Sequence, residues 1–379
     1  CIRDRIEMGK QKEEFGYATD IITSKCINWL NSRDKNKPFF LMCHHKAPHR
    51  EWEPHPKNRN LFNEDIIVPE TFDDDYKNRA KAAAEAKMRI KDDMKYADLG
   101  LVQPEGGAEV GERVRPEMSH RKIPNPDDVS KLRLIDKDTG EVYTFKTKEE
   151  LGQFKYQRYI KRYLRTIASI DESVGELLDY LDDNNLAQNT LVIYTSDQGF
   201  FLGEHGWFDK RFMYEESLRT PILMRYPKEI EKGTQVNELI QNLDFAQTFL
   251  EAAMIDSPSD MQGESLMPLL TGNVQNWDRE EVYYHYYEYP SVHMVKRHYG
   301  IVSKDYKLVR FYYDVDEWEM YDRKKDPYEL NNIYDDNNYS EIRENLHTRL
   351  ELLRKKYKDS DELNEFYIQK YLDKNKTRN

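Results

Sequence analysis

The segment that decides the fold is residues 194–210, YTSDQGFFLGEHGWFDK. It directly follows the β-branched run LVI at 191–193, which predicts a buried strand. The end of such a strand is where α/β proteins place their ligands. The polar side chains delivered to this position are Asp197, Gln198, His205 and Lys210. The segment therefore indicates a site rather than a core.

Length and composition limit the classes of protein to which the chain can belong. The chain has 379 residues, enough for two domains, and 34% of them are charged, with a formal net charge of -12. This charge disfavours a nucleic-acid or anionic-membrane partner, although a polyanionic substrate still fits a locally basic pocket. No apolar run approaches the roughly 18 residues of a membrane span. The three cysteines, Cys1, Cys26 and Cys43, form neither a disulfide framework nor a zinc motif.

The first part of the chain predicts a helix over 22–30 and a buried strand over 39–43. That strand leads into the basic segment HHKAPH at 44–49. Residues 54–150 are polar and interrupted by proline and glycine, with an Ala-rich helix expected near 80–88. We expect this insertion to be a surface excursion that walls one side of the pocket.

The middle of the chain alternates helices and strands. Apolar residues recur every three or four positions over 156–181, which predicts a long helix that ends near Asn184 and Asn185. Strands are expected over 191–194 and 221–226, and a further helix over 236–254. This alternation favours a largely parallel sheet with helices on both faces.

From about residue 275 the pattern changes to short aromatic strands followed by a helix. The expected strands cover 282–289, 299–302, 306–313 and 318–321, and the helix covers 341–357. We therefore expect an α/β catalytic domain over 1–274 and a smaller antiparallel sheet with a helix over 275–379.

Several motifs together resemble one family. Residues 163–227 contain SDQG, LGEHG, DKRFMYE and RTP, and further matching pieces lie at 39–49, 261–266 and 318–331. These motifs resemble the type I, formylglycine-dependent sulfatases of the alkaline phosphatase superfamily. The pattern is most similar to glycan sulfatases of the N-acetylglucosamine-6-sulfatase and iduronate-2-sulfatase kind. The resemblance implies an alkaline-phosphatase-like sheet and an exo-sulfatase that acts on glycosaminoglycan or mucin sugars.

The resemblance also assigns roles. In this family a formylglycine hydrate attacks sulfur while Ca²⁺ and basic side chains hold the sulfate oxygens. Asp197 and Gln198 match metal ligands, and their oxygens suit a hard cation. Lys210 matches the lysine between sulfate and nucleophile, as a compact point charge. His205 contacts sulfate or supports the loop, and a purely structural histidine is the alternative.

The basic segment 44–49 departs from the family pattern. The position after the strand is usually His, but spacing places Lys46 there, as a sulfate or leaving-group contact. His45 and His49 are expected to bind substrate, with a structural role as the alternative. Because Lys and His have very different reference pKa values, the general acid stays open.

The second domain contributes an aromatic and basic cluster. Its His293, Arg297 and His298 are expected at the pocket mouth, where relatives bind substrate. Aromatic residues at strand spacing are more often core, so this cluster carries a structural alternative as well.

One departure affects activity. The family nucleophile motif, Cys/Ser-x-Pro/Ala-x-Arg, and the Asp-Asp metal pair before it do not occur in this sequence. Cys1 lies at the right distance from Arg5, but Arg3 replaces the Pro or Ala. We expect the formylglycine to lie in a preceding segment, so that residues 1–379 alone are inactive while the full-length protein is active.

Two other functions stay open. A phosphoester or phosphonate hydrolase of the same superfamily would use two metals and a Thr or Ser nucleophile. A catalytically dead protein that binds sulfated sugar would keep the fold without turnover. The expected partner is a sulfated carbohydrate, and relatives are commonly exported. The sugar, the sulfate position and the oligomeric state are not set by the sequence.

Overall fold

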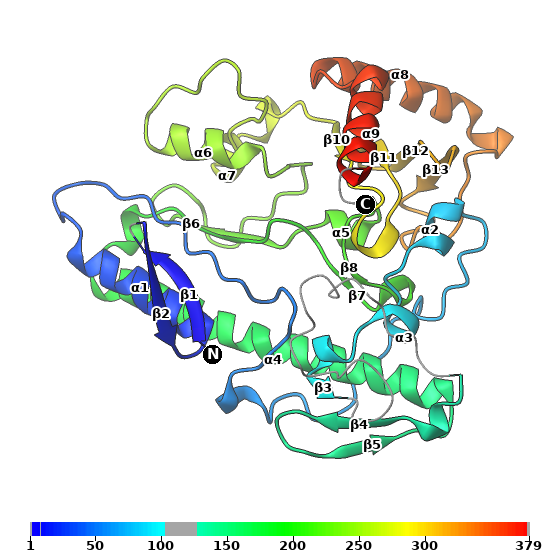
Figure 1. The fold of residues 1–379 in the computed structure, drawn as a ribbon. Helices are drawn as coiled ribbons and strands as arrows, with labels where there is room; N and C mark the ends of the chain where they lie inside the picture. The colour runs from blue at the N-terminus through cyan, green and yellow to red at the C-terminus, as the bar shows by residue number, and fades with distance from the viewer. Residues whose placement is uncertain (1, 8, 103–126, 377–379) are drawn as a thin grey trace. The chain divides into compact units, whose positions relative to one another are not determined.

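The computed structural model describes residues 2–7, 9–102 and 127–376 (Figure 1). The chain forms two compact units. The first unit comprises residues 1–70 and 89–188, and the second comprises residues 71–88 and 189–379. The predicted boundary between a catalytic domain and a smaller domain near residue 274 stays a prediction.

The first unit is built on one long helix, α4, which spans Lys148–Asp183. Thr147 caps its beginning, since its side-chain oxygen accepts the backbone N–H of Glu150 at 3.2 Å. The helix ends at Asn184, and Asn185 adopts a φ of 57°. The predicted long helix and its end are therefore confirmed.

The first unit also contains shorter elements. They are α1 (Ala18–Ser32), α3 (Ile90–Asp93), a hairpin of β1 (Ile2–Glu7) and β2 (Lys10–Phe15), and a sheet of β3 (Leu101–Val102), β4 (Arg133–Asp136) and β5 (Val142–Thr144). Polar contacts join α1 to α4, where the hydroxyls of Thr23 and Ser173 lie 2.5 Å apart. The helix predicted over 22–30 is α1.

The second unit contains a four-stranded antiparallel sheet in the order β10-β11-β12-β13. Its strands are β10 (Glu281–Tyr286), β11 (His298–Ser303), β12 (Tyr306–Phe311) and β13 (Glu317–Asp322), and two helices follow them, α8 (Ser340–Lys356) and α9 (Asp361–Lys376). One sheet face packs its Ile301 and Leu308 against Leu346 and Leu350 of α8. The small antiparallel sheet and its helix are confirmed, and α9 is an addition.

The rest of the second unit contains the segments with the predicted residues Asp197, Gln198, His205 and Lys210. Its elements are α2 (Lys81–Glu85), β6 (Val192–Thr195), β7 (Phe201–Leu202), β8 (Phe208–Asp209), α5 (Glu215–Leu218), β9 (Ile222–Arg225), α6 (Asp244–Ala252) and α7 (Met267–Leu270). The strands predicted over 191–194 and 221–226 are β6 and β9. The helix predicted over 236–254 is shorter, because only α6 forms within it.

The structure differs from the expected parallel sheet in one respect. β6 and β9 pair antiparallel, and the strand pairs assigned within the described residues are all antiparallel. Parallel neighbours need a crossover connection that is usually a helix. The one α-helix among the described residues between β6 and β9 is the four-residue α5, which follows the short strands β7 and β8. Within this described segment, no long crossover helix therefore joins β6 to β9, in agreement with their antiparallel pairing.

Two further expectations need correction. Residues 39–43 form no strand, and Phe40 and Met42 are 59% and 61% exposed. An apolar run becomes a buried strand only when neighbouring strands pair with it, and no sheet of the described residues includes this one. Residues 54–150 are not simply a surface excursion, because Ala82, Met88 and Leu99 are fully buried.

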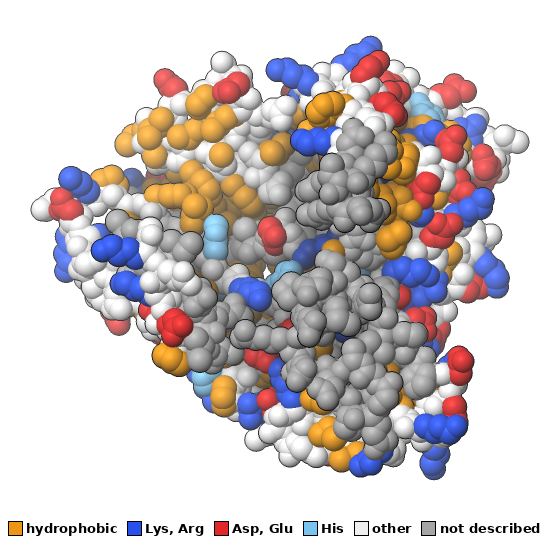
Figure 2. Space-filling view, viewed as in Figure 1, with side chains coloured by type: hydrophobic (Ala, Val, Ile, Leu, Met, Phe, Trp, Pro, Cys, Tyr) orange, Lys and Arg blue, Asp and Glu red, His pale blue; other side chains and the backbone are white. Residues whose placement is uncertain are grey.

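Exposed apolar side chains gather over α6 and α7, at the upper left of Figure 2. They include Leu243, Met254 and Ile255, of which Met254 is 94% exposed. Exposed apolar patches of this kind are typical of sites that contact another molecule. Within the described residues, no helix combines the length and apolar composition needed to cross a bilayer.

Candidate active site

The end of β6 positions the first pair of predicted residues, both in the second unit. Asp197 is exposed and Gln198 is half-buried, directly after the strand ends at Thr195. Gly199 follows, and its N–H donates to the carbonyl of Ser217 at 3.0 Å. A Cβ at Gly199 would lie 2.2 Å from the carbonyl oxygen of Glu216, so only glycine allows this close approach.

Asp197 and Gln198 fit a hard cation by donor type. Carboxylate and amide oxygens are the ligands that Ca²⁺ takes, usually six to eight of them. No group of three or more His, Cys, Asp or Glu side chains with metal-site geometry occurs among the described residues. The pair therefore supplies part of a calcium site at most.

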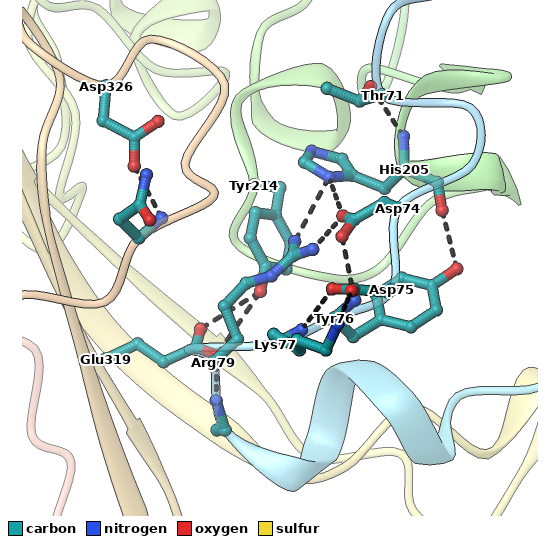
Figure 3. Close-up of polar contacts among 12 residues, drawn as sticks. Thr71, Asp74, Asp75, Tyr76, Lys77, Arg79, His205, Tyr214, Glu319 and Asp326 are labelled. Atoms are coloured by element: carbon teal, nitrogen blue, oxygen red, sulfur yellow. Dashed lines mark hydrogen bonds and ion pairs between the residues drawn. The ribbon is translucent and has the colours of Figure 1, made fainter.

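His205 is fully buried and supports its loop (Figure 3). Its Nδ1 lies 3.0 Å from Oδ2 of Asp74, and Arg79 pairs with the same carboxylate. Its backbone carbonyl accepts the hydroxyl of Tyr76 at 2.7 Å, and its N–H donates to Thr71 at 2.9 Å. Of the two roles left open by the sequence, these contacts favour the structural one. The role in sulfate contact stays a prediction.

Lys210 lies beside a buried carboxylate. Its Nζ is 3.7 Å from Oδ1 of Asp209 and lies over the ring of Phe200, 5.5 Å from the ring centroid. Arg211 donates to the same Oδ1 at 2.6 Å, and Nε2 of His293 lies 2.8 Å from Oδ2. The structure therefore brings two predicted residues, Lys210 and His293, to one carboxylate. We call Asp209, Lys210, Arg211 and His293 the Asp209 cluster.

The backbone of this cluster is unusual. Asp209 has a φ of 77°, Arg211 a φ of 105° and His293 a φ of 64°. Residues other than glycine pay a conformational cost of about 1–3 kcal/mol in this region, and such residues concentrate at functional sites. The two residues that flank Lys210 are thus held in strained conformations by their surroundings.

Arg297 and His298, which were expected at the pocket mouth with a core role as the alternative, lie in the interior of the second unit. His298 is fully buried, with Phe212 and Tyr286 among the aromatic rings around it, and burial lowers its pKa to about 3. Arg297 donates its Nε–H to the carbonyl of Tyr289 at 3.0 Å. His298 begins β11, and every residue of this strand is buried, so the strand is covered on both faces. A substrate-binding role for them stays a prediction.

The remaining predicted residues lie in the first unit. Lys46 and His49 are exposed, and the N–H of His49 donates to the carbonyl of Lys46 at 2.9 Å. Nε2 of His45 lies 3.0 Å from the hydroxyl of Ser173, and partial burial lowers the pKa of His45. These side chains follow an irregular segment instead of the expected strand. Their roles stay predictions.

Sequence reasoning missed the residues that hold the predicted ones in place. Asp209 and Arg211 flank Lys210 in the DKR triplet, where alternating charge was the available signal. Asp74 and Arg79 lie in the segment that was interpreted as an insertion. No local pattern links them to His205, which follows them by more than a hundred residues.

Comparison with known proteins identifies the family of this chain. The family model "Sulfatase" matches residues 2–255, and the model "N-sulphoglucosamine sulphohydrolase, C-terminal" matches residues 203–356. The chain belongs to the sulfatase family. This confirms the resemblance based on the motifs.

Two curated relatives and one solved structure are similar over most of the chain. The N-acetylglucosamine-6-O-sulfatase of Bacteroides thetaiotaomicron is 46% identical over 94% of this chain and 64% of its own length. An arylsulfatase of Clostridium perfringens is 25% identical over 93% of this chain and 61% of its own length. The structure of BT4656 in complex with its substrate D-glucosamine-2-N,6-O-disulfate matches with a TM-score of 0.82 and 44% identity, over 94% of this chain and 73% of that one.

These matches confirm the expected alkaline-phosphatase-like fold class. The chain spans just over three fifths of the length of these two curated relatives, 64% and 61%. The activity of a whole protein of this family is therefore a proposal for this chain.

Proposed function

We propose that this chain belongs to a sulfatase that removes sulfate from glycan sugars. The observation that carries the proposal is the 46% identity to an N-acetylglucosamine-6-O-sulfatase over 94% of the chain. The matching structure holds D-glucosamine-2-N,6-O-disulfate as its substrate. We therefore propose an amino sugar with a 6-O-sulfate as the substrate class.

Charge at the Asp209 cluster supports an anionic substrate. Lys210 and Arg211 place two cations beside the single carboxylate of Asp209, and His293 contacts its other oxygen. The side chain of Lys210 is 18% exposed, so it is not fully enclosed by the protein. In this proposal Lys210 binds the sulfate oxygens and stabilises charge as the alcohol leaves.

The other predicted residues take part as follows. Asp197 and Gln198 hold Ca²⁺, which when bound polarises the sulfate oxygens as a Lewis acid. His205 keeps the Gly203–Trp207 turn in place. Lys46, His45 and His49 contact sulfate or sugar, and the general acid is one of the basic side chains of this set. Arg297 and His298 are buried, and a substrate-binding role for them stays a prediction.

The formylglycine of the family requires a motif that the printed sequence does not contain. We propose that residues 1–379 alone release no sulfate. The test compares this chain with the product of the complete natural gene, using N-acetylglucosamine 6-sulfate and measuring released sulfate. Lys210→Ala in the complete product serves as the control for background hydrolysis.

We expect turnover by the complete product, loss of turnover in Lys210→Ala, and none from residues 1–379. Sulfate release by residues 1–379 would contradict the inactivity proposal. Binding of the sugar without turnover by the complete product would favour the sugar-binding alternative instead. Release of phosphate from a phosphomonoester, but not of sulfate, would favour the phosphoester hydrolase.

We also propose that the protein is exported, because its substrate class is an extracellular glycan. Fractionation of the source cells with an antibody against the chain tests this. A signal confined to the cytoplasm would contradict it.

A further inference from the structure

His293 lies in the interior of the second unit with both ring nitrogens against oxygen atoms. Nδ1 lies 2.9 Å from the carbonyl oxygen of Lys87, and Nε2 lies 2.8 Å from Oδ2 of Asp209. A backbone carbonyl can only accept a hydrogen bond, and so can an ionised carboxylate. Neutral imidazole has a single N–H and satisfies one of the two. The contacts therefore require that His293 carry a proton on both nitrogens or that Asp209 be neutral.

Asp209 is ionised in this setting. Its other oxygen accepts from Arg211 at 2.6 Å, and Lys210 lies 3.7 Å away. Two cations beside a buried carboxylate strongly favour its charged form. His293 is therefore the imidazolium partner of an aspartate.

The ring of His293 is fixed from two sides. The N–H of Lys87 donates to the carbonyl of His293 at 2.6 Å, so Lys87 and His293 exchange a pair of hydrogen bonds. The next residue, Met88, accepts the N–H of Phe208 at 3.0 Å, which ties the same segment to β8. The ring of Phe208 packs edge-on to His293 with centroids 5.0 Å apart. The charged group that faces the imidazole in these contacts is Asp209.

We propose that His293 is a positioning residue that keeps the ammonium of Lys210 available for sulfate. His293 takes one oxygen of Asp209 and Arg211 takes the other. Lys210, at 3.7 Å, is left outside hydrogen-bonding distance of that carboxylate. Without His293 the carboxylate turns toward Lys210 and forms a direct ion pair with it. This inference rests on the proposed role of Lys210 as the sulfate contact.

The first test is a spectroscopic one on the whole chain and needs no substrate. Nitrogen-15 NMR of the histidine rings, assigned by comparison with His293→Gln, reports how many protons each ring carries. We expect His293 to be protonated on both nitrogens at neutral pH, and to lose one of these protons in Asp209→Asn. A singly protonated His293 in the unsubstituted chain overturns the proposal.

The second test measures the reactivity of Lys210. The rate of acetylation of Lys210 by limiting acetic anhydride, read by mass spectrometry, follows the free-base fraction of its amine. An ion pair that raises the pKa of an amine by one unit lowers that fraction about tenfold. We expect acetylation of Lys210 to be about three- to tenfold slower in His293→Gln. An unchanged rate in folded His293→Gln overturns the proposal.

His347→Gln is the matched control, because His347 belongs to the same unit and contacts Tyr334 at 3.1 Å, away from the Asp209 cluster. It is expected to leave the rate at Lys210 unchanged. If both site variants fail to fold, sequential NMR assignment of the unsubstituted chain identifies the ring of His293, and its ring measurement still decides. A doubly protonated His293, together with no sulfate release by the complete gene product, would count against the proposed function and not against this assignment.

Discussion

Lys210 of the second unit and Lys46 of the first unit are both basic residues that the sequence motifs assign to sulfate, yet their surroundings differ. Lys210 is mostly buried and is flanked by two residues with strained backbone conformations, Asp209 and Arg211. The carboxylate of Asp209 also contacts His293. Lys46 is exposed in an irregular segment. A motif thus specifies which residue occupies a position. How firmly its side chain is held depends on residues that are distant in the sequence. The Asp209 cluster should be sensitive to substitution, and the 44–49 segment should tolerate it.

The largest expected effect is that of Asp209→Ala. It leaves the charges of Arg211 and His293 without their carboxylate, and breaking a buried pair in this way costs about 3–5 kcal/mol. Urea denaturation followed by circular dichroism measures the change in free energy of unfolding. Lys46→Ala is the counterpart and should change it by less than about 0.5 kcal/mol. Similar changes in the free energy of unfolding for the two variants would contradict the expected difference between the Asp209 cluster and the 44–49 segment.

The pH dependence of stability is expected to distinguish His298 from His45. The pKa of His298 in the folded protein is about 3, below its ordinary 6.5, because of burial. Between these values the unfolded chain binds a proton that the folded chain does not. The free energy of unfolding should therefore fall as the pH drops below about 6.5, by an amount on the order of a few kcal/mol.

His298→Phe, which fits among the surrounding rings, should flatten this decline. His45→Gln should alter it less, since the pKa of His45 is lowered by only partial burial. The measurement is the urea midpoint between pH 4 and pH 7 for the three proteins. Parallel curves for His298→Phe and the unsubstituted chain would show that His298 does not contribute.

The parts of the fold that follow from local pattern were predictable. The helix α4 has a strong 3.6-residue period and a Thr147 cap, and β10 to β13 have aromatic and β-branched runs between turns. The run over 39–43 has an equally clear pattern but forms no strand. Its state depends on neighbouring strands, which a local pattern does not contain.

The candidate site was predictable only in part, for the same reason. Asp197, Gln198 and Lys210 stand out because of their motif. His298 was expected at the pocket mouth because of the family resemblance, with a core role as the alternative. Alternation along a strand does not reveal that both faces of β11 are covered. The pairing of His293 with Asp209 joins residues 84 positions apart in the sequence, and no local pattern signals it.

A smaller effect is expected at Gly199, which sets the path of the chain after Asp197 and Gln198. A Cβ here would meet the carbonyl oxygens of Glu216 and Arg219 at 2.2 and 2.7 Å. Because backbone atoms cannot move aside cheaply, Gly199→Ala should destabilise the protein by about 1–3 kcal/mol. Thermal and urea denaturation both measure this. A neutral result would mean that the turn after β6 is less closely packed than the structure indicates.

The smallest effect is expected in the first unit, at Gly175 within α4. Among the described residues, no heavy atom apart from the adjacent residues and the nearby backbone of the helix lies within 4 Å of a Cβ at this position, so Ala fits without a clash. Ala loses less backbone entropy than Gly in a helix, and Gly175→Ala should raise the free energy of unfolding by roughly 0.5–1 kcal/mol. Gly199→Ala adds the same methyl group and should have the opposite sign. Urea denaturation of both variants in parallel compares Gly199, which close packing requires, with Gly175, which it does not. A loss of stability in Gly175→Ala would contradict this distinction.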